Sequence, residues 1–233
     1  MLVSLLLAAA CSSVPLRRGV GSTESPTPGS DPFPPATSGI QIQVADGADM
    51  KLEKLLSEFS RVTGMTLQIG PEVRADLSKA STGLNRSIEV PAEQVYPVVE
   101  TILSRNGFAL QLEHAGVPVI ASLCSLHQGG SGLRTWALFV DAKNIDRWAE
   151  HPAVVITTML DLPHTDVRTL SNSMRTMFTD ANTQQIIPAG NTNTLILTGF
   201  GPNVASIARM LSMVDEAAAK VPPQPMPSVE KPR

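Results

Sequence analysis

The sequence predicts an α+β protein built from two small modules in tandem. Three observations support this: the hydrophobic spacing switches repeatedly between a period of two and one of about 3.6, proline-rich stretches flank the central part of the chain, and a Gly/Ser-rich break, QGGSG, interrupts it at residues 128–132. The periods predict β-α-β-β-α-β-β for residues 39–122 and β-α-β-β-α for residues 153–219. With about 100 residues per small domain, the 233-residue chain has room for two separate cores.

The first eleven residues, MLVSLLLAAAC, predict export from the cytoplasm. Their apolar run is shorter than the ~20 residues of a membrane-spanning helix, and it ends in small residues before a cysteine, which resembles a bacterial lipobox. We expect residues 1–11 to be a signal peptide with Cys11 as the lipidation site, and the protein to be periplasmic and held on a membrane, with the outer membrane favoured. An unlipidated signal peptide is the alternative, because no Lys or Arg precedes the run.

Two segments are rich in residues that bury little surface. Residues 12–38 consist mainly of Ser, Pro, Gly and Thr, and residues 220–233 are rich in Pro. Compositions of this kind favour extended, solvated chain. We therefore expect a disordered tether before the first module and a disordered tail after the second.

The first module begins with a strand in which three apolar residues alternate with glutamines, at Ile40, Ile42 and Val44. Asp49 is expected to cap a helix that Gly64 ends. The inward face of this helix follows helical spacing, at Leu52, Leu55, Leu56, Phe59 and Val62. A strand from Met65 comes next.

The rest of the first module continues with a loop through Pro71 and a strand at residues 87–90. A second helix ends near Gly107, and Pro97 is expected either to lie in its first turns or to kink it. The runs FALQLE and VPVIAS then predict a closing hairpin.

Residues 123–152 are expected to connect the modules. Trp136 to Val140 predicts a strand, and Asp141 opens a short helix in which Ile145 and Trp148 share a face. Both tryptophans of the chain, Trp136 and Trp148, lie here. We interpret them as packing against a flanking module, with a role as interface anchors as the alternative.

The second module begins with a strand from Val154 to about Asp161. Thr165 or Asp166 is expected to cap a helix with one apolar side, at Val167, Leu170, Met174, Met177 and Phe178. The run QQIIPAGNTNTLILTG predicts a hairpin, and Pro202 starts a closing helix whose inward residues are Val204, Ile207, Ala208, Leu211 and Val214. A three-stranded sheet covered by two helices on one face leaves its other face and its edges to a neighbour.

The sequence predicts no catalytic residue, no metal site and no cofactor. The four histidines, His114, His127, His151 and His164, lack metal-ligand spacing. His164 with Asp166, and Asp161 with Asp166, are interpreted as capping and surface groups around one turn. Cys124 is expected to be a small buried apolar residue without a disulfide partner. A net charge of −3 shows no basic excess of the kind that binds nucleic acid.

Two stretches of motifs resemble a known family. The run LDLPHTDVRTLSNSMRTMFTD…QQIIPAGNTNTLILTGFGPNVASIARMLSMVD resembles the KH-like periplasmic repeat of secretins, and MKLEKLLSEFSRVTGMTLQIGPEV with VPAEQVYPVVETILSRNGFALQLEHAGVPVIA resembles the N-terminal secretin domain that is shared with the signalling domain of TonB-dependent receptors. Together they cover about residues 40–215. The secretin pore domain has no counterpart in this sequence.

The resemblance implies an assembly or scaffold protein of a type II secretion or type IV pilus system. Its expected partners are secretin or other secretion-system subunits, further copies of itself, and a membrane through Cys11. Candidate interface residues are Asn191, Asn193 and Thr194 on the hairpin, for which ordinary turn chemistry is the alternative.

Two other functions stay open at this point. The first is a signal-receiving domain that docks a partner on a sheet edge. The second is KH-type nucleic-acid binding through a GXXG loop, but the chain has G-F-G-P at residues 199–202 and neither Lys nor Arg from Thr176 to Phe200. We therefore expect no nucleic-acid partner.

Overall fold

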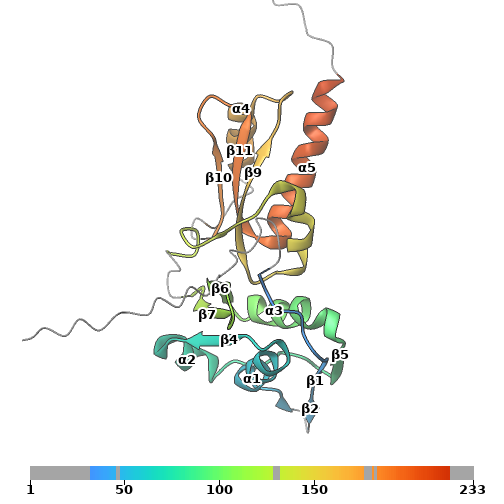
Figure 1. Cartoon of the computed structure of the whole chain (residues 1–233), viewed down its shortest axis with the longest axis vertical. Coiled ribbons are helices and arrows are strands. Elements are labelled where there is room, and N and C mark those ends of the chain that lie inside the picture. The colour runs from blue at the N-terminus through green and yellow to red at the C-terminus, as the bar shows by residue number, and fades with distance from the viewer. Residues whose placement is uncertain (1–31, 46–47, 128–131, 176–179, 181–182, 221–233) are drawn as a thin grey trace, which may run out of the picture.

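The computed structural model describes residues 32–45, 48–127, 132–175, 180 and 183–220. It has the predicted α+β architecture, with a lower module drawn in blue to green and an upper one in yellow to red (Figure 1). In the described parts of the chain, no helix is both long enough and apolar enough to cross a membrane.

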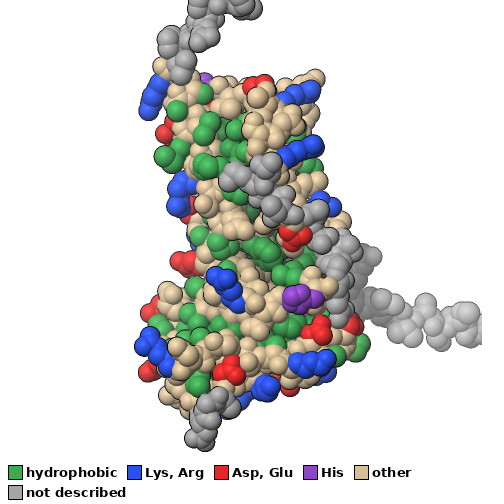
Figure 2. Space-filling model, turned by 180° about the vertical axis from the view of Figure 1, so that it is seen from behind, with side chains coloured by type: hydrophobic (Ala, Val, Ile, Leu, Met, Phe, Trp, Pro, Cys, Tyr) green, Lys and Arg blue, Asp and Glu red, His purple; other side chains and the backbone are tan. Residues whose placement is uncertain are grey.

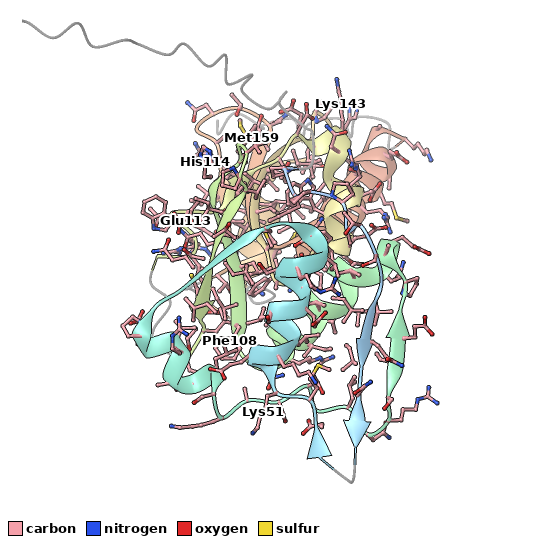
Figure 3. All side chains as sticks on the ribbon, turned by 60° about the horizontal axis from the view of Figure 1, so that its bottom comes forward. Lys51, Phe108, Glu113, His114, Lys143 and Met159 are labelled. Atoms are coloured by element: carbon pink, nitrogen blue, oxygen red, sulfur yellow. The ribbon has the colours of Figure 1, made fainter. Side chains whose placement is uncertain are left out.

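The first module is organised around a three-stranded sheet of order β4-β7-β6. Strand β4 (Thr66–Ile69) runs parallel to β7 (Ile120–Ser125), which pairs antiparallel with β6 (Phe108–His114) and so confirms the predicted hairpin. Figure 3 shows β6 running from Phe108 towards Glu113 and His114. Two short ladders complete the module, formed by β1 (Ile40–Ile42) with β5 (Ile88–Val90) and by β2 (Val44–Ala45) with β3 (Ala48–Asp49).

Both predicted helices of the first module are confirmed. The five apolar residues predicted for the inward face of α1 (Leu52–Thr63) are all buried, and Gly64 ends the helix with a φ of 69°. Helix α3 (Val95–Arg105) follows the 3-10 turn η1 (Ala92–Gln94). Pro97 lies in the first turn of α3, where its missing N–H removes no helical hydrogen bond.

Two predictions for this module are wrong. Residues expected to form a loop are the helix α2 (Pro71–Leu77), which starts on Pro71 and buries Val73 and Leu77, four residues apart. Because this apolar pair lies among polar residues, the sequence shows no clear helical spacing here. Asp49 does not cap α1, because its carboxylate accepts a hydrogen bond from the N–H of Gly83 at 2.6 Å.

The second module contains a sheet of four strands, in the order β10-β11-β9-β8. The predicted strands are β9 (Val155–Asp161), β10 (Gln185–Pro188) and β11 (Thr194–Phe200). The fourth, β8 (Leu138–Phe139), comes from the segment predicted to connect the modules and runs parallel to β9. The 3-10 helix η2 (Ala142–Glu150) follows it, with Asp141 as its cap and with Ile145 and Trp148 buried on one side. Trp148 packs as predicted, but the same prediction for Trp136 is wrong, because that side chain is 65% exposed.

Helices α4 (Val167–Met174) and α5 (Gly201–Ala219) cover one face of this sheet. Asp166 caps α4 by accepting from the N–H of Arg168 at 3.0 Å. Val214, predicted to point inward on α5, is exposed, and Asp215 is buried in its place. Its carboxylate accepts from the N–H of His164 at 2.9 Å and from the hydroxyl of Thr165 at 2.8 Å. The predicted helix positions Met177 and Phe178 lie outside the described residues, as does most of the QGGSG break.

The expectation of two separate cores is wrong, because one cluster of buried apolar side chains runs through both modules. At the junction the N–H of Leu110 in β6 donates to the carbonyl of Ala153 at 2.8 Å. The end of the predicted tether also joins this core, since Phe33 is buried and Ala36 packs against the cluster. Burial of the apolar side chains of Phe33 and Ala36 stabilises these positions in the fold, although the sequence around them is polar and rich in proline.

Candidate interaction surfaces

Among the described residues, helices α4 and α5 cover one face of the second module's sheet and leave part of the other face exposed. Strand residues alternate between the faces, and Ile156, Leu195 and Leu197 are buried on the helix side. The strand registers place the opposite set side by side. We call this set the open face: Phe139, Thr157, Met159, Ile187, Ile196 and Thr198.

The open face carries a row of apolar side chains across three strands. Ile187 lies opposite Ile196, and Ile196 lies opposite Met159. Met159 is 47% exposed, Ile187 39% and Phe139 63%. Beside this row the hydroxyls of Thr157 and Thr198 hydrogen-bond to each other at 2.8 Å, so their polar atoms need no outside partner. An exposed apolar row of this kind is suited to contact with another protein. Asp161, two residues after Met159 on the same face, accepts a hydrogen bond from Thr194.

Helix α5 carries a second apolar surface on its outward side. Met210, Met213 and Val214 follow each other at i, i+3 and i+4 and are all exposed. The inward residues of the same helix, such as Ala208 and Leu211, are buried. The α5 stripe therefore faces away from the sheet, and the open face lies on the sheet's other side. Hydrophobic side chains, in green, also reach the surface among scattered charges on the side shown in Figure 2.

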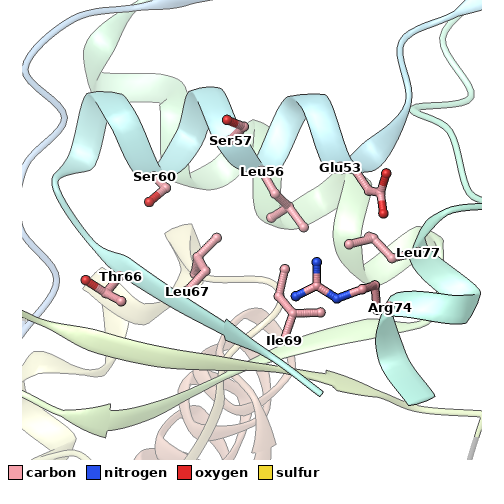
Figure 4. Close-up of a pocket in the computed structure, with 9 residues that line it drawn as sticks. All are labelled: Glu53, Leu56, Ser57, Ser60, Thr66, Leu67, Ile69, Arg74 and Leu77. Carbon is pink, nitrogen blue, oxygen red and sulfur yellow. The ribbon is translucent and has the colours of Figure 1, made fainter. Parts of the chain in front are cut away.

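The first module offers an unpaired strand edge beside a groove. Strand β4 ends its sheet, and the N–H of Thr66 donates towards β7, to the carbonyl of Val119 at 2.9 Å. Because successive backbone groups point to opposite sides of a strand, those of Leu67 and Ile69 point to the free edge. A groove of about 530 Å³ lies between α1, β4 and α2. Figure 4 shows Leu56, Leu67 and Ile69 inside it, with Glu53 and Arg74 at one end.

The three hairpin residues predicted as interface candidates form hydrogen bonds within their own module. Asn191 accepts from the guanidinium of Arg168 at 2.6 Å, and the amide of Asn193 donates to the carbonyl of Pro163 at 3.2 Å. Thr194 is buried and its hydroxyl donates to Asp161 at 2.6 Å. The side chains of Asn191 and Asn193 are exposed, whereas the buried Thr194 side chain links β11 to β9.

Other residues considered for chemistry have structural partners. Hydrogen bonds from the Thr169 hydroxyl and the Arg168 N–H lower the pKa of Asp166, as expected for a helix cap. Burial, and then the charge of Glu113, raise the pKa of the half-buried Cys124 thiol and so disfavour the reactive thiolate. Within the described ranges, no three His, Cys, Asp or Glu side chains gather in a way that could hold a metal ion. Cys11 lies outside the described residues.

The glycine-containing turn before α5 is explained by packing. A Cβ atom at Gly201 would collide with the carbonyl oxygen of Trp148 in η2. The N–H of Gly201 also donates to the carbonyl of Val154 at 3.0 Å. The close approach of α5 to η2 therefore requires glycine at this position, independently of any phosphate contact.

The chain matches no protein-family model, and no curated protein matches it. Among solved structures it is similar to a chain of the Klebsiella pneumoniae type II secretion system outer membrane complex of PulD, PulS and PulC HR domain, with 18% identity, a TM-score of 0.47, and coverage of 81% of this chain and 26% of that one. It thus spans about a quarter of that chain's length.

Two further similar structures come from type II secretion proteins of other bacteria. One is a chain of the enterotoxigenic Escherichia coli GspC-GspD complex, with 15% identity, 76% and 98% of the two chains covered, and a TM-score of 0.25. The other is the N-terminal domain of the secretin XcpQ from Pseudomonas aeruginosa, with 13% identity, 76% and 64% covered, and a TM-score of 0.25. XcpQ is described as a secretin, the family that the sequence motifs resemble.

Proposed function

We propose that this protein is a non-catalytic periplasmic assembly component of a secretin-type secretion or type IV pilus system. It docks to secretin subunits or to further copies of itself. The observation that carries the proposal is the apolar row Ile187, Ile196 and Met159, which crosses the open face of the second module. The secretin-like motifs in the sequence support an assembly of this kind.

The two apolar surfaces of the second module are suited to a heterologous contact, in which one surface of a copy packs against the other surface of the next copy. The open face and the α5 stripe of Met210, Met213 and Val214 point in opposite directions, so one copy can present its stripe to the open face of the next. A contact of this kind repeats from copy to copy and closes into a ring when the rotation permits. Neither the row nor the stripe contains a charged residue, so the apolar side chains of the two surfaces meet without an ion between them.

The experiment is sedimentation velocity on the mature chain over a wide concentration range, combined with capture of a purified secretin ring. Concentration-dependent association, or retention on the ring, supports the proposal. A chain that stays monomeric at high concentration and passes over the ring unbound contradicts it.

A partner-docking or signal-receiving role is the second candidate, and the edge of β4 favours it. Proteins protect strand edges with proline, charge or bulges. Strand β10 ends in Pro188 and β6 has a register shift between Leu112 and His114, but β4, with the sequence TLQI, has none of these features. An extended segment of another protein could add to it and place alternate side chains in the adjoining groove. Binding that Arg74→Glu weakens and open-face substitutions leave unchanged would favour this role.

We also propose that Cys11 is lipidated and holds the protein on a membrane, with the outer membrane favoured. The small residues before the cysteine support this site. Radioactive palmitate should label the wild-type protein and not Cys11→Ser. Equal labelling of both would leave an unlipidated signal peptide as the explanation.

A further inference from the structure

The exposed methionines among the residues that the structure describes all lie on the two apolar surfaces of the second module. Met159 belongs to the row on the open face, and Met210 and Met213 are two of the three residues of the α5 stripe. Their side chains are 47%, 37% and 66% exposed, in that order. Small solutes in the surrounding water therefore have direct access to these three side chains.

The other methionines in the described ranges are shielded from water. Met50, Met65 and Met174 are 8%, 1% and 5% exposed and belong to the buried core. A dissolved oxidant must reach the sulfur atom to react with it, so the exposed methionines react before the buried ones. Mild oxidation therefore changes the two surfaces while the core stays intact.

Oxidation puts a polar group in place of an apolar one at these positions. Hydrogen peroxide gives one oxygen atom to the methionine sulfur, which is oxidised by two electrons to the sulfoxide, and the peroxide is reduced to water. The sulfoxide oxygen is a hydrogen-bond acceptor, and burying it without a donor is unfavourable. The other residues of the row and the stripe are Ile187, Ile196 and Val214, whose side chains have no donor.

We propose that these three methionines make the assembly contact sensitive to oxidation, so that sulfoxide formation weakens the contact and reduction restores it. The inference rests on the function proposed above, because it concerns the same two surfaces. In a heterologous contact each interface holds Met159 of one copy and Met210 and Met213 of the next, so it can acquire three sulfoxides. A thiol-dependent methionine sulfoxide reductase reverses the change: the sulfoxide oxygen leaves as water and two thiols are oxidised to a disulfide.

Limited treatment of the full mature chain with hydrogen peroxide tests the proposal. Peptide mass spectrometry should find one added oxygen on each exposed methionine while Met50, Met65 and Met174 are still unmodified. Sedimentation velocity or capture on a secretin ring should then give a dissociation constant at least about tenfold higher, with the circular dichroism spectrum unchanged. Purified methionine sulfoxide reductases A and B, which act on the two sulfoxide epimers, should restore the original value in the presence of dithiothreitol.

The matched control is the triple variant Met159→Leu, Met210→Leu and Met213→Leu, which keeps both surfaces apolar and has no thioether on them. It should associate like the wild type before and after peroxide. Peroxide-induced loss of association in this variant would place the effect at another site, such as Cys124, and would overturn the proposal. Wild-type association that is unchanged once the three sulfoxides have formed would also overturn it. An untreated wild type that binds neither itself nor a secretin ring would instead overturn the proposed function, and this inference with it.

Discussion

Glu100 Oε1 lies 2.7 Å from Nδ1 of His151, and both side chains are buried. Glu100 belongs to α3 of the first module, whereas His151 directly follows η2. The second oxygen of the same carboxylate accepts from the N–H of Ala153. The buried Glu100 carboxylate thus connects α3 to His151 and to Ala153, the two ends of the short segment that leads into β9.

Glu100→Ala should destabilise the protein strongly. The substitution leaves His151 and the Ala153 N–H buried without the carboxylate, and removing one partner of a buried polar pair costs about 3 kcal/mol or more. Glu100→Gln keeps an acceptor for Ala153 and should cost less. Urea unfolding measures both, with the exposed Glu93→Gln on η1 as a matched control. A change of under about 0.5 kcal/mol in Glu100→Ala would contradict the assigned role.

Charges on the open face should weaken association without unfolding the module. In Met159→Lys with Ile187→Lys, the side chains at the two ends of the apolar row are replaced by ammonium groups that stay solvated in the free protein and are costly to bury. We expect the dissociation constant for self-association or secretin binding to rise at least about tenfold, with stability changed by about 0.5 kcal/mol or less. Thr192→Lys, at the exposed tip of the same hairpin, is the control and should bind normally.

The cap of α4 should contribute stability that depends on pH. The pKa of Asp166 is lowered in the folded protein, so its contribution is present above the unfolded value of about 3.9 and is lost as the pH falls through the lower folded value. Asp166→Ala should therefore lower the urea midpoint at pH 7, and this difference should shrink in acid. Glu216→Ala, exposed on α5, provides the comparison. A difference that is the same at pH 7 and pH 3 would rule out the charged cap.

Two neighbouring threonines on β9 should respond in opposite directions to replacement by valine. The Thr158 hydroxyl is buried and has no hydrogen-bond partner among the residues that the structure describes. Thr158→Val removes this unsatisfied group and should be neutral or stabilising by about 1 kcal/mol. Thr157→Val breaks the bond to Thr198 and should cost about 1 kcal/mol. Thermal unfolding of the two variants measures both changes in stability. A large loss of stability in Thr158→Val would show that the Thr158 hydroxyl has a hydrogen-bond partner.

Regular spacing made most of the fold predictable from the sequence. Leu52, Leu55 and Phe59 on α1 and the glycine turn between β10 and β11 carry strong local signals, and the structure confirms both elements. Helix α2 was missed because only Val73 and Leu77 are apolar among polar neighbours. Strand β8 has two residues, and its place beside β9 depends on a contact between distant segments that local periodicity does not encode.

The candidate surfaces were predictable only in part. An open sheet face followed from two helices on one side, but the register that aligns Ile187, Ile196 and Met159 is a tertiary property. Phe33 stands in a proline-rich run whose composition predicts a tether, and a single buried ring reverses that expectation. Glu100 and His151 are 51 positions apart, so no spacing motif links them.

The Asp215 carboxylate has a practical consequence for shortening the chain. It lies near the end of α5, yet it accepts hydrogen bonds from the N–H of His164 and the hydroxyl of Thr165, just ahead of α4. A fragment trimmed at Met210 would therefore lose more than an exposed helical end, because the turn that enters α4 would have two donors without their acceptor. Expression boundaries for this protein should fall after Asp215, even where an earlier stop would keep every strand.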